Sequence, residues 1–217
     1  MVGLLIKDMR LFLGQKNIYV AVLVFSAIMA LTGQDIFFVI SYCTMLCTFF
    51  TISTVSYDEF NHGYAFLFTM PITRKGYALE KYLFGALMGG GVWLVTMILG
   101  GIYSSMTDSE FVTSEWFVGA IWILLVMAIM LCVMLPLQIK FGADKSRVAL
   151  FGLVIIIVAG SSFFMKIVQN TDLPKPDITW MTEISMGIWL LTGAAVTAIA
   201  VVISILISIK ILENKQF

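Results

Sequence analysis

Charge is what this sequence has least of. Only 12% of its 217 residues are Asp, Glu, Lys or Arg, which is roughly half the share found in soluble globular domains. A water-soluble fold of this size could not cover its surface with so few charges, whereas a lipid bilayer solvates an apolar surface. With 60% hydrophobic residues and a mean hydropathy of +1.01, the composition predicts an integral membrane protein.

Residues that commonly carry chemistry are also scarce. There is one histidine, His62, and the three cysteines are an odd number placed within apolar runs. Cys43 and Cys47 have a helical i, i+4 spacing, but no further residue completes a metal-ligand pattern, so we expect these two and Cys132 to be free thiols packed between helices. The formal net charge is zero and no segment forms a basic nucleic-acid surface. We therefore expect no metal site and no nucleic-acid partner.

The longest apolar runs contain no ionisable residue. Asp, Glu, Lys, Arg and His are all absent from the six runs given below, although such residues within a membrane usually mark a proton or ion relay. The glycines at positions 85 to 91 lie in one of these runs and no Gly-Lys-Ser/Thr follows them, so they do not form a nucleotide-binding loop. These absences argue against a proton-driven pump and against a membrane-embedded enzyme. They predict that the chain has no catalytic residue and no cofactor of its own.

Six apolar runs are long enough, or nearly long enough, to cross a bilayer as helices. They predict an all-α, polytopic fold that makes residues 1–217 a single transmembrane domain. The first run is short, and Gly33 and Asp35 after it are suited to end one helix and cap the next. That run could instead be a cleaved signal peptide, or half of a re-entrant hairpin with the second run. The predicted spans are residues 18–32, 36–56, 83–103, 116–139, 148–165 and 184–209.

Basic residues predict the orientation of these spans. Six crossings place both termini on the same side, and eleven of the 13 Lys and Arg residues lie in segments on that side. By the positive-inside rule this side is cytoplasmic. We therefore expect a multi-pass protein of the cytoplasmic (inner or plasma) membrane with both termini in the cytoplasm. The basic residues on the cytoplasmic side are Lys7, Arg10, Lys16, Arg74, Lys75, Lys81, Lys140, Lys145, Arg147, Lys210 and Lys215.

Small and hydroxyl-bearing residues gather in two of the predicted spans. Gly85 and Gly89 form a small-xxx-small pair, which lets two helix backbones approach closely, either within the chain or with a second protomer. In the preceding span, hydroxyl residues recur at helical spacing and share a face. Their hydroxyl groups could bond to other helices or to the backbone, or they could line a polar path for a transported substrate. The residues of this candidate path are Ser41, Thr44, Thr48 and Thr51.

The link between the second and third spans, residues 57–76, is the most informative segment. It begins with acidic residues, ends with basic ones, and has between them an apolar stretch too short to cross a membrane. An acidic first turn followed by an apolar face predicts a helix that lies along the membrane surface, and Pro71 is expected to end it. Arg74 and Lys75 are expected to face lipid headgroups or a cytosolic partner, with the next helix beginning near Tyr77.

This link resembles the loop after the second span of ABC-2 type transporter permeases. An acidic residue, a glycine, an apolar stretch, Met-Pro-Ile-Thr-Arg and then Lys81 occur in the family's order, although Tyr64 stands where the family often has threonine. In that family the loop holds a coupling helix that docks into the ATP-hydrolysing subunit. Residues 1–16 likewise resemble the family's amphipathic, interfacial connecting helix. The resemblance implies that coupling to the ATPase involves Glu59, Phe60, Gly63, Tyr64, Met70, Pro71, Arg74 and Lys75.

The same resemblance implies a function. The chain would be the permease subunit of an ATP-driven ABC exporter that works with two copies of a separate ATPase subunit, which binds ATP and Mg. Six helices are half of the usual exporter, so a second permease copy or a homologue would complete a dimer. The short external loops are similar to those of Gram-positive permeases that export amphipathic peptides such as phenol-soluble modulins, which implies an amphipathic or hydrophobic substrate such as a peptide, toxin or drug. The alternative is a non-transporting membrane scaffold, or an immunity protein against membrane-active peptides.

Overall fold

The computed structural model is built from α-helices. It describes residues 2–14, 20, 24–26, 28, 35–60, 63–67, 69, 71–107, 113–170 and 185–215. No strand occurs among these residues, so the all-α prediction is confirmed. The helices, in chain order, are α1 (Val2–Gly14), α3 (Ile36–Glu59), α4 (Gly63–Leu67), α5 (Arg74–Thr107), α6 (Thr113–Asn170) and α8 (Met186–Asn214).

Four helical segments in the described part of the chain are long and apolar enough to cross a bilayer. They are α3, α5, the part of α6 from Trp116 to Gly142, and α8. They match the predicted spans 36–56, 83–103, 116–139 and 184–209, and they identify a multi-pass membrane protein. The predicted first span, 18–32, lies largely outside the described residues. The predicted fifth span, 148–165, is helical in the second part of α6 but is not among these four segments. A total of six spans therefore stays a prediction.

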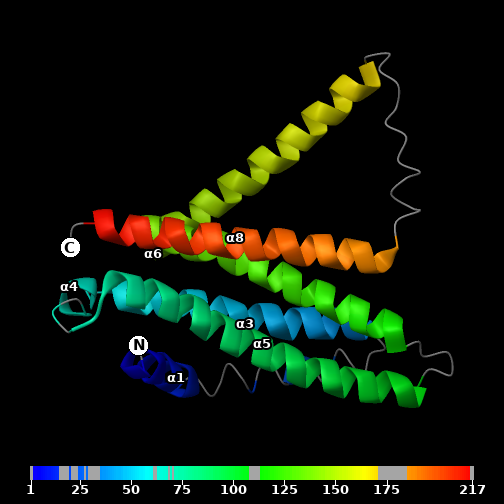
Figure 1. Ribbon diagram of the computed structural model, residues 1–217, viewed down its shortest axis with the longest axis horizontal. Helices are drawn as coiled ribbons and strands as arrows, with labels where there is room; N and C mark the ends of the chain where they lie inside the picture. Colours follow the sequence, from blue (N-terminus) through cyan, green and yellow to red (C-terminus); the bar gives the residue numbers. More distant parts are fainter. Residues whose placement is uncertain are drawn as a thin grey trace.

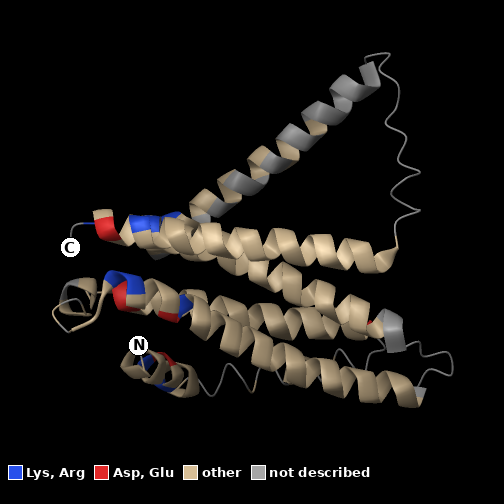
Figure 2. Cartoon of the chain, viewed as in Figure 1, with Lys and Arg blue, Asp and Glu red and all other residues tan. Residues whose placement is uncertain are grey.

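Charged side chains gather at one end of the bundle, which Figure 2 shows and which we call the charged end. Here α3 and α8 finish and α5 begins, and α1 and α4 lie beside them (Figure 1). The helices reach further into this end than the apolar runs do. Helix α3 continues to Glu59, and α5 begins at Arg74 rather than near Tyr77. The extension is possible because Asp58, Glu59 and Arg74 in these added turns have polar partners on other parts of the bundle.

Gly142 interrupts α6. Its φ of +79° is a conformation that residues with a side chain rarely adopt. A Cβ atom there would also lie 2.7 and 2.8 Å from the two carboxylate oxygens of Glu59. Beyond Gly142 the helix leaves the bundle at an angle (Figure 1). The interruption thus lies between the predicted spans 116–139 and 148–165, and Ser146 just after it donates a hydrogen bond back to Gln138 Oε1 at 2.5 Å.

An apolar core fixes the helix ends at the charged end. It takes buried side chains from α1, α3, α5, α6 and α8, namely Leu4, Val55, Tyr77, Leu135 and Leu212. Residues of α4 join the same cluster. Because burial of apolar surface is the main favourable term that holds a packed core together, the short link between α3 and α5 has a defined position on the bundle. The side chains around that link are the candidate functional site.

Candidate functional site at the charged end

Lys81 lies at the centre of the charged end with its side chain fully buried. Its ammonium group contacts the carboxylates of two other helices, Asp8 of α1 and Asp58 of α3. The distance from Lys81 Nζ to Asp58 Oδ2 is 2.8 Å, and Nζ also donates to Thr54 Oγ1 at 3.1 Å. These contacts use the three hydrogens of the ammonium group, as a charge buried away from water requires.

Lys7 of α1 adds a second positive charge to this cluster. Its ammonium group pairs with Asp58 and lies 3.2 Å from Asp8 Oδ1. Burial acts to lower the pKa of Lys7, but the neighbouring carboxylates of Asp58 and Asp8 raise that pKa above its ordinary value. The ammonium is therefore charged at neutral pH. We call Lys7, Asp8, Asp58 and Lys81 the charge lock, because together they join α1, α3 and α5.

Other polar groups surround the charge lock. The Tyr77 hydroxyl donates a hydrogen bond to Asp58 Oδ2 at 3.0 Å. Glu80, also buried, has its carboxylate 4.0 Å from Lys81 Nζ, and neither of its oxygens has a hydrogen-bond partner within the described part of the chain. Removing one partner of a buried ion pair strongly destabilises a protein, since the other partner is left buried and without a compensating charge. The charge lock therefore fixes the position of α1 as long as all its members are present.

Glu59, the first residue of the predicted coupling set, ends α3 rather than beginning a surface helix. Its carboxylate lies 3.4 Å from Lys215 Nζ and packs against Gly142. Lys215 also donates to the carbonyl of Ile139 at 3.0 Å. The prediction that these acidic residues form the first turn of a surface helix is thus wrong, because Asp58 and Glu59 belong to α3 and α4 starts only at Gly63. The acidic residues are used instead to pair with bases from other helices.

Arg74, another residue of the predicted coupling set, contacts the end of α8. Its guanidinium donates hydrogen bonds to the carbonyls of Leu212 at 2.9 Å and Glu213 at 2.6 Å. These are carbonyls of the last turn of α8, which have no partner within their own helix. Lys75 is exposed and pairs loosely with Glu213, at 3.8 Å. Arg74 therefore caps α8 and ties it to the start of α5, rather than facing lipid or a partner alone.

Gly63 and Tyr64 position α4. A Cβ at Gly63 would lie 2.5 Å from the backbone oxygen of Asp58, so the close turn after α3 requires glycine. Tyr64 is buried, with its ring edge-on to Tyr77 at a centroid distance of 5.8 Å, and Lys215 Nζ lies 5.1 Å from its ring centre. Burial raises the pKa of the Tyr64 phenol above its ordinary value. These two predicted residues hold the link in place and leave little surface for a partner.

Large apolar side chains are exposed on the same link. Phe60 is 74% exposed and Phe66 is 68% exposed, with Tyr57 and Pro71 also exposed beside them. We call these four residues the docking face. A groove of about 610 Å³ between α1 and the link borders three of them, Tyr57, Phe66 and Pro71. Exposed aromatic residues next to a concave surface are typical of a protein–protein contact. Met70, the remaining predicted coupling residue, lies outside the described residues.

The candidate substrate path is buried between helices. Thr44, Thr48 and Thr51 are almost fully buried, and the Thr48 hydroxyl donates to the carbonyl of Thr44 at 2.8 Å. Ser41 and Thr44 donate in the same way to the backbone four residues before them. A Cβ added at Gly89 of α5 would lie 2.7 Å from Thr48 Oγ1, and one at Gly85 would lie 3.3 Å from Thr51 Cγ2. The structure thus shows backbone bonding for Ser41, Thr44 and Thr48. The buried Thr51 hydroxyl has no hydrogen-bond partner among the described residues. A substrate path along these four residues stays a prediction.

Two polar clusters were not anticipated from the sequence. One is the charge lock, whose signal was that Asp58 and Lys81 flank two consecutive apolar runs at the same end and carry opposite charges. The other joins α5, α8 and α6 through hydroxyl groups, in which Tyr82 contacts Ser204 at 2.5 Å and Ser208 at 2.9 Å. Ser204 in turn donates to the carbonyl of Cys132 at 2.5 Å. No short pattern in the sequence indicates this second cluster, since its three contacts join residues that are 72, 122 and 126 positions apart.

Comparison with known proteins covers nearly the whole chain. Residues 3–213 match the family model described as "ABC-2 family transporter protein". The matched range includes the charge lock, the docking face and the four membrane-crossing segments. No curated protein and no solved structure shows a significant match.

Proposed function

The chain belongs to the ABC-2 transporter family, and from that premise we propose that it is the permease subunit of an ATP-driven exporter. Membership implies a membrane component that works with a separate ABC ATPase subunit, which supplies ATP hydrolysis. The observation that carries the proposal is the docking face, because it places exposed aromatic side chains on the short link between two membrane-crossing helices. A partner bound there contacts both helices at once.

The contacts around the link support a route for motion from the ATPase to the membrane. Movement of α4 acts directly on α3 and α5, which it joins. Through Arg74 the start of α5 is tied to the end of α8, and through the charge lock α3 and α5 are tied to α1. A displacement of the docking face would therefore shift several helix ends together. In this proposal two ATPase copies, with their ATP and Mg, act on a pair of permeases made of this chain and a second copy or a homologue.

We place the charged end in the cytoplasm, with six spans in total. The support is the basic asymmetry of the sequence, because cytoplasmic segments of membrane proteins are rich in Lys and Arg. The docking face then lies on the side where ATP is available. The segment 18–32 and the second part of α6 would supply the other two crossings. With them, α3 and α8 run towards the charged end and α5 runs away from it, as Figure 1 shows.

This orientation predicts the labelling of single cysteines in intact cells. A cysteine at position 107, the last residue of α5, should react with a membrane-impermeant maleimide added outside, and one at position 213 should not. After the cells are opened, the cysteine at 213 should react as well. The native cysteines are buried, and the unsubstituted protein measures their background. External labelling at 213 together with protection at 107 would show that the orientation is reversed.

The docking face can be tested by purifying the tagged chain from its native membrane and measuring ATP hydrolysis in the eluate. The double variant Phe60→Ala/Phe66→Ala should lose about 95% of the co-purified ATPase activity, since truncating interface anchors of this kind costs about 2 kcal/mol or more. Its matched control is Phe38→Ala. Phe38 is 51% exposed but lies near the opposite end of α3, so its loss should leave the co-purified activity unchanged.

The result separates the proposal from its alternative. Full retention of ATPase activity by the Phe60→Ala/Phe66→Ala variant would show that the ATPase binds elsewhere. If the unsubstituted chain itself brings down no ATP-hydrolysing subunit, a non-transporting scaffold or immunity protein is the better account.

The substrate proposed is amphipathic or hydrophobic, because the apolar runs contain no ionisable group to bind a hydrophilic solute in the membrane.

A further inference from the structure

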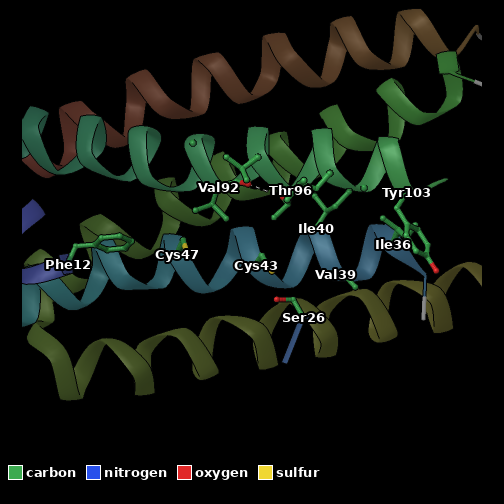
Figure 3. Close-up of a pocket in the computed structure, with 14 residues that line it drawn as sticks. Phe12, Ser26, Ile36, Val39, Ile40, Cys43, Cys47, Val92, Thr96 and Tyr103 are labelled. Atoms are coloured by element: carbon green, nitrogen blue, oxygen red, sulfur yellow. Dashed lines mark hydrogen bonds between the residues drawn. The ribbon is translucent and has the colours of Figure 1, made fainter. Parts of the chain in front are cut away.

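An elongated cavity of about 520 Å³ lies between α3 and α5, away from the charged end. Figure 3 shows its labelled residues spread along the length of α3, from Phe12 at one extreme to Ile36 and Tyr103 at the other. Cys43 lies within its α3 wall, and Cys47 is the α3 lining residue nearest the charged end. The cavity is on a different face of α3 from the threonines that pack against Gly85 and Gly89.

The walls of this cavity are almost entirely hydrocarbon. Its hydroxyl-bearing lining residues are Ser26, Thr96 and Tyr103. Thr96 already donates to the carbonyls of Val92 and Trp93, at 2.9 and 3.2 Å. Among the described residues that line the cavity there is no Asp, Glu, Lys, Arg or His. Water is disfavoured beside apolar walls, because they offer it no hydrogen-bond partners. Its natural content is therefore an apolar group rather than water, a sugar or a nucleotide.

The length of the cavity matches one membrane leaflet. Eleven residues separate Ile36 from Cys47 on α3, which at a helical rise of about 1.5 Å per residue is about 16 Å. The hydrocarbon core of a bilayer is about 30 Å thick, so one leaflet contributes about half of that. At the end nearer the charge lock the cavity stops at Phe12, whose ring packs edge-on against Phe50 at 4.9 Å. The cavity therefore runs from the end of the bundle opposite the charged end to about mid-membrane.

We propose that this cavity binds one acyl chain of a bilayer lipid from the leaflet opposite the charged end. An acyl chain is unbranched, apolar and one leaflet long, and the surrounding membrane supplies it at high concentration. Because no charged residue lies among the described lining residues, the lipid headgroup stays outside the cavity. Gly91 gives the chain room on the α5 wall, since a Cβ built there meets no atom within 4 Å. This inference does not depend on the proposed transport function.

Two neighbouring glycines provide a matched pair of variants. A leucine at Gly91 would fill the cavity, whereas a leucine at Gly90, which also has no atom within 4 Å of its Cβ, would lie outside it. The unsubstituted chain and both variants are reconstituted in phosphatidylcholine vesicles that contain a phosphatidylcholine with a photoreactive group in its acyl chain. After illumination, cross-linked peptides are mapped by mass spectrometry. We expect labelling of the α3 segment around Cys43 in the unsubstituted chain and in Gly90→Leu, and about tenfold less in Gly91→Leu.

Alkylation of the native cysteines gives a second test. It uses the unsubstituted chain, so it does not depend on whether the Gly91→Leu variant folds. Cys47 lines the cavity, while Cys132 is buried elsewhere, on α6. Removing lipid in detergent should raise the rate of Cys47 alkylation by N-ethylmaleimide, and adding phosphatidylcholine should lower it again, with no change at Cys132. Equal labelling in both glycine variants, or Cys47 reactivity unaffected by lipid, would overturn the proposal. Labelling by a photoreactive amphipathic helical peptide but not by the phospholipid would assign the cavity to another occupant and reject the lipid.

Discussion

Lys81→Met should strongly destabilise the protein and lower its Tm in detergent by roughly 6–20 °C. Methionine has a similar length but no charge, so Asp8 and Asp58 would be left buried with Lys7 as their remaining base. Removing one partner of a buried ion pair costs about 3–5 kcal/mol, and each kcal/mol lowers the Tm of a chain of this size by about 2–4 °C. Thermal unfolding followed by circular dichroism measures the change.

The same substitution on the same helix provides the control. Lys75 is 68% exposed in its side chain and pairs only loosely with Glu213, so Lys75→Met should change stability by less than about 1 kcal/mol. Adding Asp8→Asn to Lys81→Met should restore part of the loss, because it removes one of the uncompensated carboxylates. If Lys81→Met and Lys75→Met unfold at the same temperature, the charge lock does not hold α1, α3 and α5 together.

Gly89→Leu should also destabilise the bundle, by about 1–3 kcal/mol or more. A Cβ at Gly89 would lie 2.5 Å from Met127 Sδ and 2.7 Å from Thr48 Oγ1. The flexible Met127 side chain can move, but Thr48 is β-branched and its hydroxyl is hydrogen-bonded to the carbonyl of Thr44. The leucine would therefore push α5 away from α3 and α6. The yield of monodisperse protein and its Tm should both fall.

Gly90→Leu tests whether this effect comes from packing. A Cβ at Gly90 meets no atom within 4 Å, and leucine favours the helix over glycine by up to about 1 kcal/mol. The two adjacent substitutions should thus have opposite signs, with Gly90→Leu as stable as the unsubstituted chain or more so. A loss of similar size in both variants would point to a general intolerance of bulk on α5 and against the close contact at Gly89.

Four of the six spans could be predicted from the sequence, because a long apolar run without charges is stable as a helix across a bilayer. The small-xxx-small pair also predicted a close helix contact, and Gly85 and Gly89 make it within the chain. The run-based boundaries were too short at one end, however. Asp58 and Glu59 continue α3, and Arg74 opens α5, because charged residues with partners on other helices can remain helical and buried. An apolar run contains no information about those partners.

The roles of individual site residues were harder to predict for the same reason. The family resemblance grouped Glu59 with Arg74 as coupling residues, and the structure pairs Glu59 with Lys215 and Arg74 with the end of α8. Which side chains of the link are exposed depends on how α4 packs, and the sequence does not show this. The predicted coupling set therefore included Phe60 but not Phe66, which is exposed to a similar extent. Family resemblance identifies the segment, and only tertiary contacts separate the residues that hold it from those that present a surface.

The charge lock has a consequence for the order of events during biosynthesis. Asp8 and Lys81 are 73 residues apart, so at a synthesis rate of about 5–20 residues per second the base appears about 4–15 s after the acid. During that interval α1 exists without its main tertiary partner, while its exposed apolar residues, Ile6, Met9 and Leu13, can rest on the membrane surface. Until the start of α5 has been made, Lys7 and Asp58 alone join α1 to the rest of the charge lock, and a nascent chain that stalls before Lys81 lacks the contact between α1 and α5.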